Sequence, residues 1–500
     1  MEILFLRGED VLQQTYWAWE WSNVGNPQFK ILQRDQLDIV LKLLDQSLPG
    51  FLEEEKKLAG KELADAIEEA NLHFHLREDL LEKETVTDND RRVTLMINRC
   101  LTGAFSDIER ERRLLSELSE LLLPPELISE LRKKSEKLSP DGVEVRVLPA
   151  PCCARIPWEI LPTNNPEDPD ERLLDLARVI TMAPLLSRDG DEHINHPDWQ
   201  AHKNEPPLYI IDPSKDLLNK EKAEEWETIL SDTKHPDLQG VLGEPGSYGA
   251  LRKDVNRSWL RNALKIKRSR FIYFGHVIAD ESTAGKTALW ITDLPQVYGL
   301  GDVKLRRIQR RRKQRRRLLT AQDLFAGTAN KDFMEKRLTE KWNKPRKDAI
   351  LKEFGQDQPE YPDGAKDSDG NGIEVQGVHL WPMPPRAALI ACSSGEDYTH
   401  PEPFGLVTAF LELGAEIVTA TRWTMLADAA FPGETANPLS DIAFAADQIL
   451  QDQDPNSALT KWQRQCLRSW RETNAITSSP LSWAALTNYY APDRTERRKN

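Results

Sequence analysis

Hydrophobic residues recur at two different spacings along the chain, and the spacing changes near residue 141. Before that point they recur every three or four positions, as in Leu114 and Leu118, which predicts an all-helical module over residues 1–140. Beyond it, Val143, Val145 and Val147 alternate with polar residues, a period that is typical of a strand. We therefore expect a domain boundary at this point.

After the boundary, short apolar runs alternate with helical stretches. Such alternation predicts an α/β domain over residues 141–493, with a caspase-like, mostly parallel sheet flanked by helices. Residues 494–500 are expected to be a frayed tail. The runs and helical stretches are Leu208–Ile211, Leu251–Leu264, Phe271–Phe274, Ala387–Ala391, Phe404–Leu413 and Glu416–Ala420.

Two polar stretches interrupt the alternation and are predicted to be insertions between sheet elements. The first, near residues 302–318, contains the basic run Lys304–Arg317. The second covers residues 327–385 and is rich in Lys, Asp, Gly and Pro. A loop as long as the second is usually functional or mobile when it interrupts a compact domain.

Composition narrows the class of protein. Charged residues make up 30% of the 500 residues, and no run of about eighteen apolar residues occurs, so we expect no membrane association and no secretory leader. The five cysteines form no C-x-x-C pair, which argues against a disulfide framework and a zinc site and favours the reducing cytoplasm. We expect no metal and no cofactor.

The basic run is an exception to a chain whose formal net charge is -14. Its charge density would neutralise several phosphates of a polynucleotide, but no aromatic residues are interleaved to stack on bases. A solvated insertion, or a docking segment for an acidic protein, explains the run as well. Nucleic acid is therefore a possible partner through Lys304–Arg317, but not the favoured one.

A histidine and a cysteine each follow an apolar run. His276 comes after Tyr273-Phe274-Gly275, and Cys392 comes after Ala387–Ala391. The carboxyl ends of parallel strands share one edge of a sheet, so these two groups can meet there although they are far apart in sequence. An imidazole beside a thiol takes its proton and produces a nucleophile. Each residue alone is more often structural, but their joint placement favours a catalytic dyad.

These residues belong to a set of segments that resembles the CHAT-domain peptidases, relatives of caspases and separases. The segments occur in the order in which that family has them. They are Arg155–Leu161, Phe271–His276, Leu319–Leu324, Ala391–Gly395, Phe404–Thr424 and Pro480–Ala485.

The resemblance implies cleavage of a protein substrate through a thioester. By position, Cys392 is the nucleophile, His276 is the base, and the N–H groups of Val277 and Cys392 hold the oxyanion. Val277 departs from the family's usual glycine and adds bulk, which puts the rate in question. In relatives that cleave after a basic residue, the substrate pocket lies beside a tryptophan, here Trp423, and has an acid a few positions beyond it. The expected positions hold Leu426 and Ala427, and Asp428 follows one place later, so Asp428 is either a shifted pocket acid or a helix N-terminal aspartate.

Two functions follow from these features. The first is a regulated cysteine endopeptidase, controlled by a protein partner or an activating ligand, for which the family suggests a bacterial conflict or antiviral defence system. The alternative is a catalytically inactive caspase-like scaffold that binds an acidic partner or RNA through the basic run. Val277 favours the scaffold, and the intact His276 and Cys392 oppose it.

Overall fold

The computed structural model describes residues 1–11, 14–73, 88–183, 197–211, 263–278, 287–291, 317–326, 381–391, 405–431 and 438–490, with residues 224, 255, 260 and 377. The chain divides into two compact units. The first comprises Met1–Pro184, Ile390–Pro401 and Thr419–Asn500, and the second comprises Leu185–Leu389 and Glu402–Val418. In the part of the chain that is described, no helix has the length and apolar character needed to cross a membrane.

Three antiparallel strands open the first unit. They are β1 (Glu2–Val11), β2 (Gln14–Trp21) and β3 (Val24–Leu32). The prediction of an all-helical module over residues 1–140 is therefore wrong for this segment. β2 forms a strand because its buried residues recur with a period of two and because the segment is rich in aromatic residues, which favour strands. The buried residues of β2 are Thr15, Trp17, Trp19 and Trp21.

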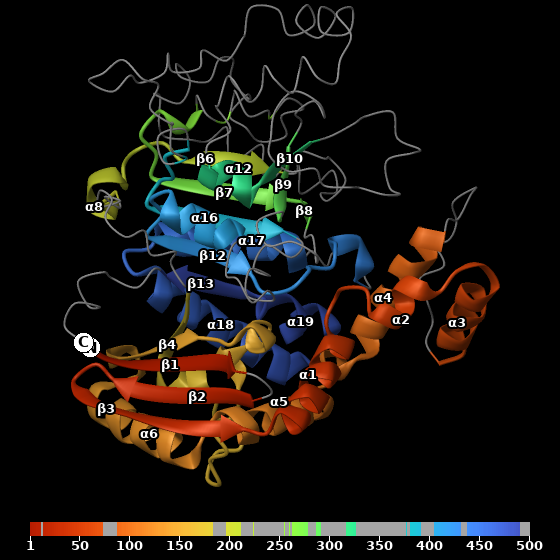
Figure 1. Ribbon diagram of the computed structural model, residues 1–500, viewed down its shortest axis with the longest axis horizontal. Helices are drawn as coiled ribbons and strands as arrows, with labels where there is room; N and C mark the ends of the chain where they lie inside the picture. Colours follow the sequence, from red (N-terminus) through yellow and green to blue (C-terminus); the bar gives the residue numbers. More distant parts are fainter. Residues whose placement is uncertain are drawn as a thin grey trace, which may run out of the picture. The chain divides into compact units, whose positions relative to one another are not determined.

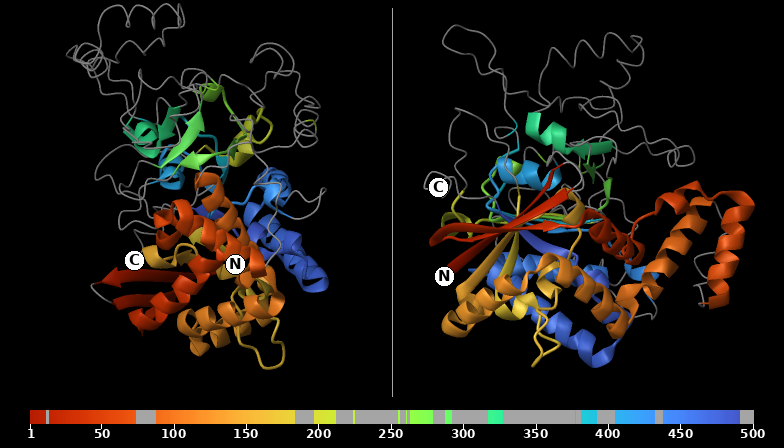
Figure 2. Two further views of the ribbon diagram at one scale, coloured as in Figure 1. Left: turned by 90° about the vertical axis from the view of Figure 1, so that its right-hand side faces the viewer. Right: turned by 60° about the horizontal axis from the view of Figure 1, so that its bottom comes forward.

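The remainder of the N-terminal segment is helical, which confirms that part of the prediction. Asp107 caps α5 by accepting hydrogen bonds from two backbone N–H groups, and Pro125 occupies the first position of α6. Figure 2 shows α3 and α4 packed side by side. The helices are α1 (Arg34–Ser47), α2 (Glu53–Lys57), α3 (Gly60–His73), α4 (Asp88–Thr102), α5 (Ile108–Leu122) and α6 (Pro125–Leu138).

The sheet of the first unit is mostly parallel beyond β1, and helices flank it, as predicted. The parallel pairs are β1 with β4 (Val143–Leu148), β4 with β5 (Arg178–Met182), and β5 with β13 (Leu486–Tyr490). The order is β3-β2-β1-β4-β5-β13, followed by β12 (Ile417–Thr421) (Figure 1). Strands from both sides of residue 141 thus share one sheet, and the domain boundaries given above stay predictions.

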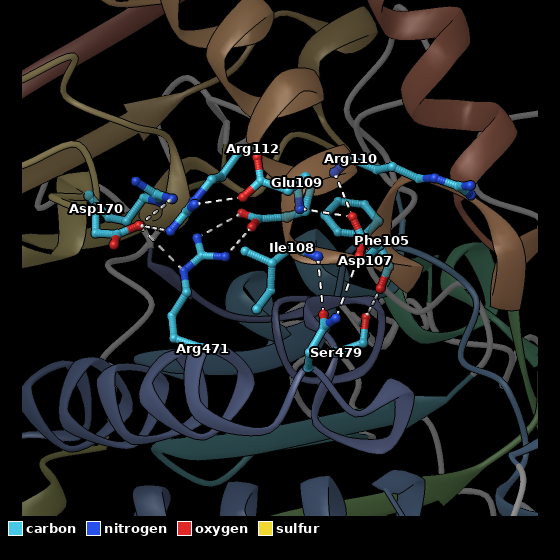
Figure 3. A network of polar contacts seen from close by, with 12 residues as sticks. Phe105, Asp107, Ile108, Glu109, Arg110, Arg112, Asp170, Arg471 and Ser479 are labelled. Atoms are coloured by element: carbon cyan, nitrogen blue, oxygen red, sulfur yellow. Dashed lines mark hydrogen bonds and ion pairs between the residues drawn. The ribbon is translucent and has the colours of Figure 1, made fainter.

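A polar network joins α5 to α18 (Pro455–Thr473) in the first unit (Figure 3). Arg471 on α18 donates hydrogen bonds from both terminal guanidinium nitrogens to Glu111, whose carboxylate is fully buried. Arg112 donates to Asp170, which also lies within ion-pair distance of Arg471. The buried Glu111 is therefore paired, as a buried carboxylate must be.

The second unit holds β6 (Leu208–Ile211) and β7 (Arg270–Gly275), which pair in parallel and are buried along their whole length. Next to β7 comes β11 (Arg386–Ala391), and α16 (Leu406–Glu412) packs Phe410 against Phe271 of β7. A small antiparallel sheet contains β8 (Val277–Ile278), β9 (Ala288–Ile291) and β10 (Arg317–Thr320). Three predicted apolar runs are thus confirmed as strands, namely Leu208–Ile211, Phe271–Phe274 and Ala387–Ala391.

Both predicted insertions fall largely outside the described residues. Of the basic run, the structure describes Arg317, which begins β10. Of residues 327–385, it describes Gly377 and 381–385, while the C-terminal residues 491–500 are not described.

Candidate functional site

His276 lies directly beyond the carboxyl end of β7, between that strand and β8. The five residues before it are buried, whereas His276 itself is partly exposed. Its ring packs at a tilt against Trp290 of β9, with the ring centroids 5.6 Å apart. The histidine is thus placed as the sequence predicts, at the end of a buried parallel strand, where α/β proteins bind ligands.

The backbone of His276 is fixed by the residues around it. The hydroxyl of Tyr273 donates to the carbonyl oxygen of His276 at 2.7 Å, and the N–H of Trp290 donates to the same oxygen at 3.0 Å. The Tyr273 ring also covers Gly275, where an added Cβ would lie 2.8 Å from that ring. Glycine is therefore required before the histidine, because any larger residue would displace the tyrosine.

Val277 stands where the resemblance predicts an oxyanion donor. It lies opposite Leu289 in the antiparallel β8–β9 ladder. The preceding pair in this ladder is His276 opposite Trp290, and a hydrogen bond joins these two residues. Hydrogen-bonded and non-hydrogen-bonded pairs alternate in such a ladder, so the N–H of Val277 points away from β9. Its side chain is only 6% exposed, so most of its added bulk is covered by protein.

Cys392 directly follows β11 but lies outside the described residues. The catalytic pairing of Cys392 with His276 stays a prediction. What the structure adds is the strand: β11 is a strand up to Ala391, and its described side chains, from Arg386 to Ile390, are buried. The cysteine therefore follows a strand end, as His276 does.

Trp423 belongs to the packed interior of the first unit. It is fully buried, its indole N–H donates to the carbonyl oxygen of Leu481 at 2.9 Å, and its ring stacks on Phe105 at 6.4 Å. An indole whose N–H is satisfied in this way has a clear packing function. A role in the substrate pocket stays a prediction.

Asp428 faces the start of α17 (Pro438–Gln451). One carboxylate oxygen accepts from the backbone N–H of Leu439 at 2.7 Å and of Ser440 at 3.4 Å, and the other accepts from the Ser440 hydroxyl at 2.6 Å. Burial raises the pKa of this carboxyl above its ordinary value, although the hydrogen bonds oppose the shift. Of the two roles open from the sequence, these contacts are those of a helix-capping aspartate.

A buried ion pair that sequence reasoning did not single out lies beside Trp423. Arg422 and Glu159 are 1% and 2% exposed and form a two-pronged pair, with one contact of 2.6 Å. Thr487 also donates to Glu159 at 3.2 Å. The sequence feature that could have drawn attention to these two residues is their position within segments compared above with the CHAT-domain peptidases. The pair joins two of those segments.

A third such segment, Leu319–Leu324, contains the N-terminus of a helix. The N–H of Thr320 donates to the Asp323 carboxylate at 3.1 Å, and the N–H of Asp323 donates to the Thr320 hydroxyl at 3.0 Å. This reciprocal capping box begins α12 (Ala321–Ala326). Much of the sequence pattern in these segments is therefore explained by folding requirements.

Comparisons with known proteins add little to this picture. No protein-family profile and no curated protein matches the chain. Among solved structures, it is similar to the separase–securin complex of Saccharomyces cerevisiae, with 10% sequence identity and a TM-score of 0.37. The match covers 98% of this chain and 30% of that chain. A similarity of this degree carries no argument, so the CHAT resemblance stays a prediction.

Metal chemistry has no site among the residues that the structure describes, since no three His, Cys, Asp or Glu side chains gather there in a metal-binding arrangement.

Proposed function

We propose that this chain is a cysteine endopeptidase with Cys392 as nucleophile and His276 as general base. The observation that supports it is the position of His276, partly exposed directly beyond the buried strand β7 and fixed through its own carbonyl oxygen. Cys392 follows β11 in the sequence in the same way. Strand ends of this kind are where α/β proteins place reacting groups.

The proposed reaction begins when His276 takes the thiol proton of Cys392. The thiolate attacks the scissile carbonyl, and the N–H groups of Cys392 and Val277 stabilise the oxyanion. His276 then gives its proton to the leaving amine, which departs and leaves a thioester. Finally His276 activates a water molecule, which hydrolyses the thioester and regenerates the thiol.

The first test measures the thiol and needs no substrate. An unassisted thiol is only a few per cent thiolate at pH 7, so His276→Ala should slow alkylation of Cys392 by iodoacetamide at least about tenfold. The matched control is His202→Ala, because His202 is another partly exposed histidine, whose ring forms a hydrogen bond with the backbone carbonyl oxygen of Asp198, the N-cap of its own short helix, α8 (Trp199–His202). Equal alkylation rates in all three proteins would overturn the dyad.

The second test measures cleavage. Wild-type protein is incubated with a proteome-derived peptide library, and new peptide ends are identified by mass spectrometry. Cys392→Ala and His276→Ala should each abolish the new ends, while Cys466→Ala should not. Cleavage that persists in Cys392→Ala would exclude this mechanism, and an absence of both cleavage and assisted alkylation in the wild type would favour the inactive scaffold.

We also propose that such an enzyme works in a reducing compartment under the control of a protein partner or ligand. An endopeptidase that acts on proteins must be held inactive until it is needed. The support for a conflict or defence setting is the sequence resemblance alone.

A further inference from the structure

Two adjacent cysteines lie close together in the first unit. Cys152 and Cys153 occupy a single 3-10 turn (Pro151–Cys153) shortly after β4, and their sulfur atoms are 3.6 Å apart. Cys152 is partly exposed, whereas Cys153 is fully buried. One thiol is therefore accessible to a small reagent, and the other is held directly behind it.

Charged groups surround the accessible thiol. Its sulfur lies 3.6 Å from a carboxylate oxygen of Asp10, which also accepts from the Thr15 hydroxyl at 2.6 Å and from the Arg34 guanidinium at 3.0 Å. The sulfur thus sits at the edge of a polar cluster built from β1, β2 and α1.

The two thiols differ in acidity. The hydrogen bond between the two sulfurs lowers the pKa of Cys152, because the Cys153 thiol can donate to a thiolate on Cys152; the positive charge of Arg34 helps, while burial and the charge of Asp10 oppose the shift. The same hydrogen bond, together with burial, raises the pKa of Cys153. Burial also raises the pKa of Cys100 and of Cys466 to about 12. Of these four cysteines, Cys152 has the greatest tendency to form a thiolate.

We propose that Cys152 and Cys153 are an oxidisable dithiol, which a hydroperoxide converts into a vicinal disulfide. The Cys152 thiolate attacks the peroxide oxygen, the O–O bond breaks, and hydroxide or an alkoxide leaves, which gives a sulfenic acid on Cys152. The Cys153 sulfur then attacks the Cys152 sulfur, so that the S–S bond forms and the S–O bond of the sulfenic acid breaks. The leaving hydroxide takes the thiol proton of Cys153 and departs as water. The dithiol loses two electrons and the peroxide gains them.

The geometry favours this reaction over oxidation of a single thiol. The resolving sulfur is already in contact with the attacking one, so closing the bond shortens the gap by only about 1.5 Å. A disulfide between adjacent residues closes a small ring, which makes it strained and easily reduced. Such a bond is reversible, as a modification site in a reducing compartment has to be.

The experiment uses the full chain with Cys392→Ala, so that the proposed catalytic thiol does not react. Reduced protein is treated with hydrogen peroxide and digested. The peptide that holds Cys152 and Cys153 should lose two hydrogen atoms in mass and regain them with dithiothreitol. It should react at least about tenfold faster than Cys466, because the peroxide reacts with thiolates.

Three variants separate the steps. With Cys153→Ser, Cys152 should stop at the sulfenic acid and be trapped by dimedone. With Cys152→Ser, the rapid reaction should disappear. Cys466→Ser is the matched control and should behave like the parent.

A measurement without substitutions checks the same pair. Phenylarsine oxide bridges two neighbouring thiols, so the folded protein should bind one equivalent at this site and then resist peroxide. The proposal is overturned if Cys152 and Cys153 stay reduced while Cys466 oxidises, if they react only as separate thiols, or if the arsenical does not protect them.

Discussion

Replacing Asp428 tests whether this residue caps a helix or binds substrate. Alanine removes the acceptor for Leu439 and Ser440 at the start of α17. Loss of a cap costs about 0.5–2 kcal/mol, and a buried donor left without a partner costs about 1–3 kcal/mol. Some of this loss is offset, because the buried carboxylate is itself unfavourable. We therefore expect Asp428→Ala to lower the free energy of unfolding by about 2–3 kcal/mol.

Asparagine separates the two roles of Asp428. Its amide oxygen still accepts from Leu439, so Asp428→Asn should cost less than about 1 kcal/mol. Because burial raises the pKa of Asp428 in the folded protein, its stabilising contribution is full below the ordinary pKa of 3.8 and is lost as the pH rises through the raised value. The wild type should therefore gain stability relative to Asp428→Asn when the pH falls from 7 to 4.

Urea unfolding, followed by circular dichroism, measures these differences. The capping role would be refuted if Asp428→Ala unfolded at the wild-type urea concentration, or if Asp428→Asn were as damaging as alanine. Cleavage of the peptide library by Asp428→Asn gives the independent readout. An unchanged cleavage-site preference fits a cap, and a selective loss of basic sites would return Asp428 to the pocket.

Three further predictions concern other parts of the chain. Glu159→Gln leaves the buried Arg422 without its charged partner and should lower the free energy of unfolding by about 3–5 kcal/mol in urea, whereas Glu159→Leu combined with Arg422→Met should recover much of the loss; a double variant no better than the single one would contradict this. Gly275→Ala should slow alkylation of Cys392 at least about tenfold, because its Cβ displaces Tyr273 and thereby His276; an unchanged rate would show that this packing is irrelevant. Deleting residues 304–316 should leave the circular dichroism spectrum intact and change only partner binding, so loss of folded protein would show that the run is structural.

Strands with a uniform apolar character could be predicted from the sequence. Leu208–Ile211 is observed as β6, and the run at 271–274 lies within β7, because strands buried on both faces leave no polar positions. The period of two in the N-terminal strands is masked where apolar residues also occupy the less buried face, as Ile3 and Phe5 do beside the buried Leu4 and Leu6 of β1. The helical spacing of the residues that follow, from α1 to α6, is the stronger signal in this part of the sequence.

At the candidate site, the sequence predicted where His276 lies but not what surrounds it. The contact of Tyr273 with the carbonyl oxygen of His276 depends on a ring that folds back over Gly275, which no spacing rule anticipates. The pairing of Glu159 with Arg422 joins residues remote in sequence and depends on tertiary packing. Such contacts follow from the fold, so they could not be read before it.

The parallel pairing of β1 with β4 affects any attempt to study residues 141–493 alone. A shortened chain that began at Asp141 would keep β4 but lose the partner that now covers its outer side along residues 143–148. Val143, Val145 and Val147, now fully buried, would lie in an edge strand with unpaired N–H and C=O groups. Such an edge recruits strands from other molecules, so we expect the shortened protein to aggregate where the full chain does not.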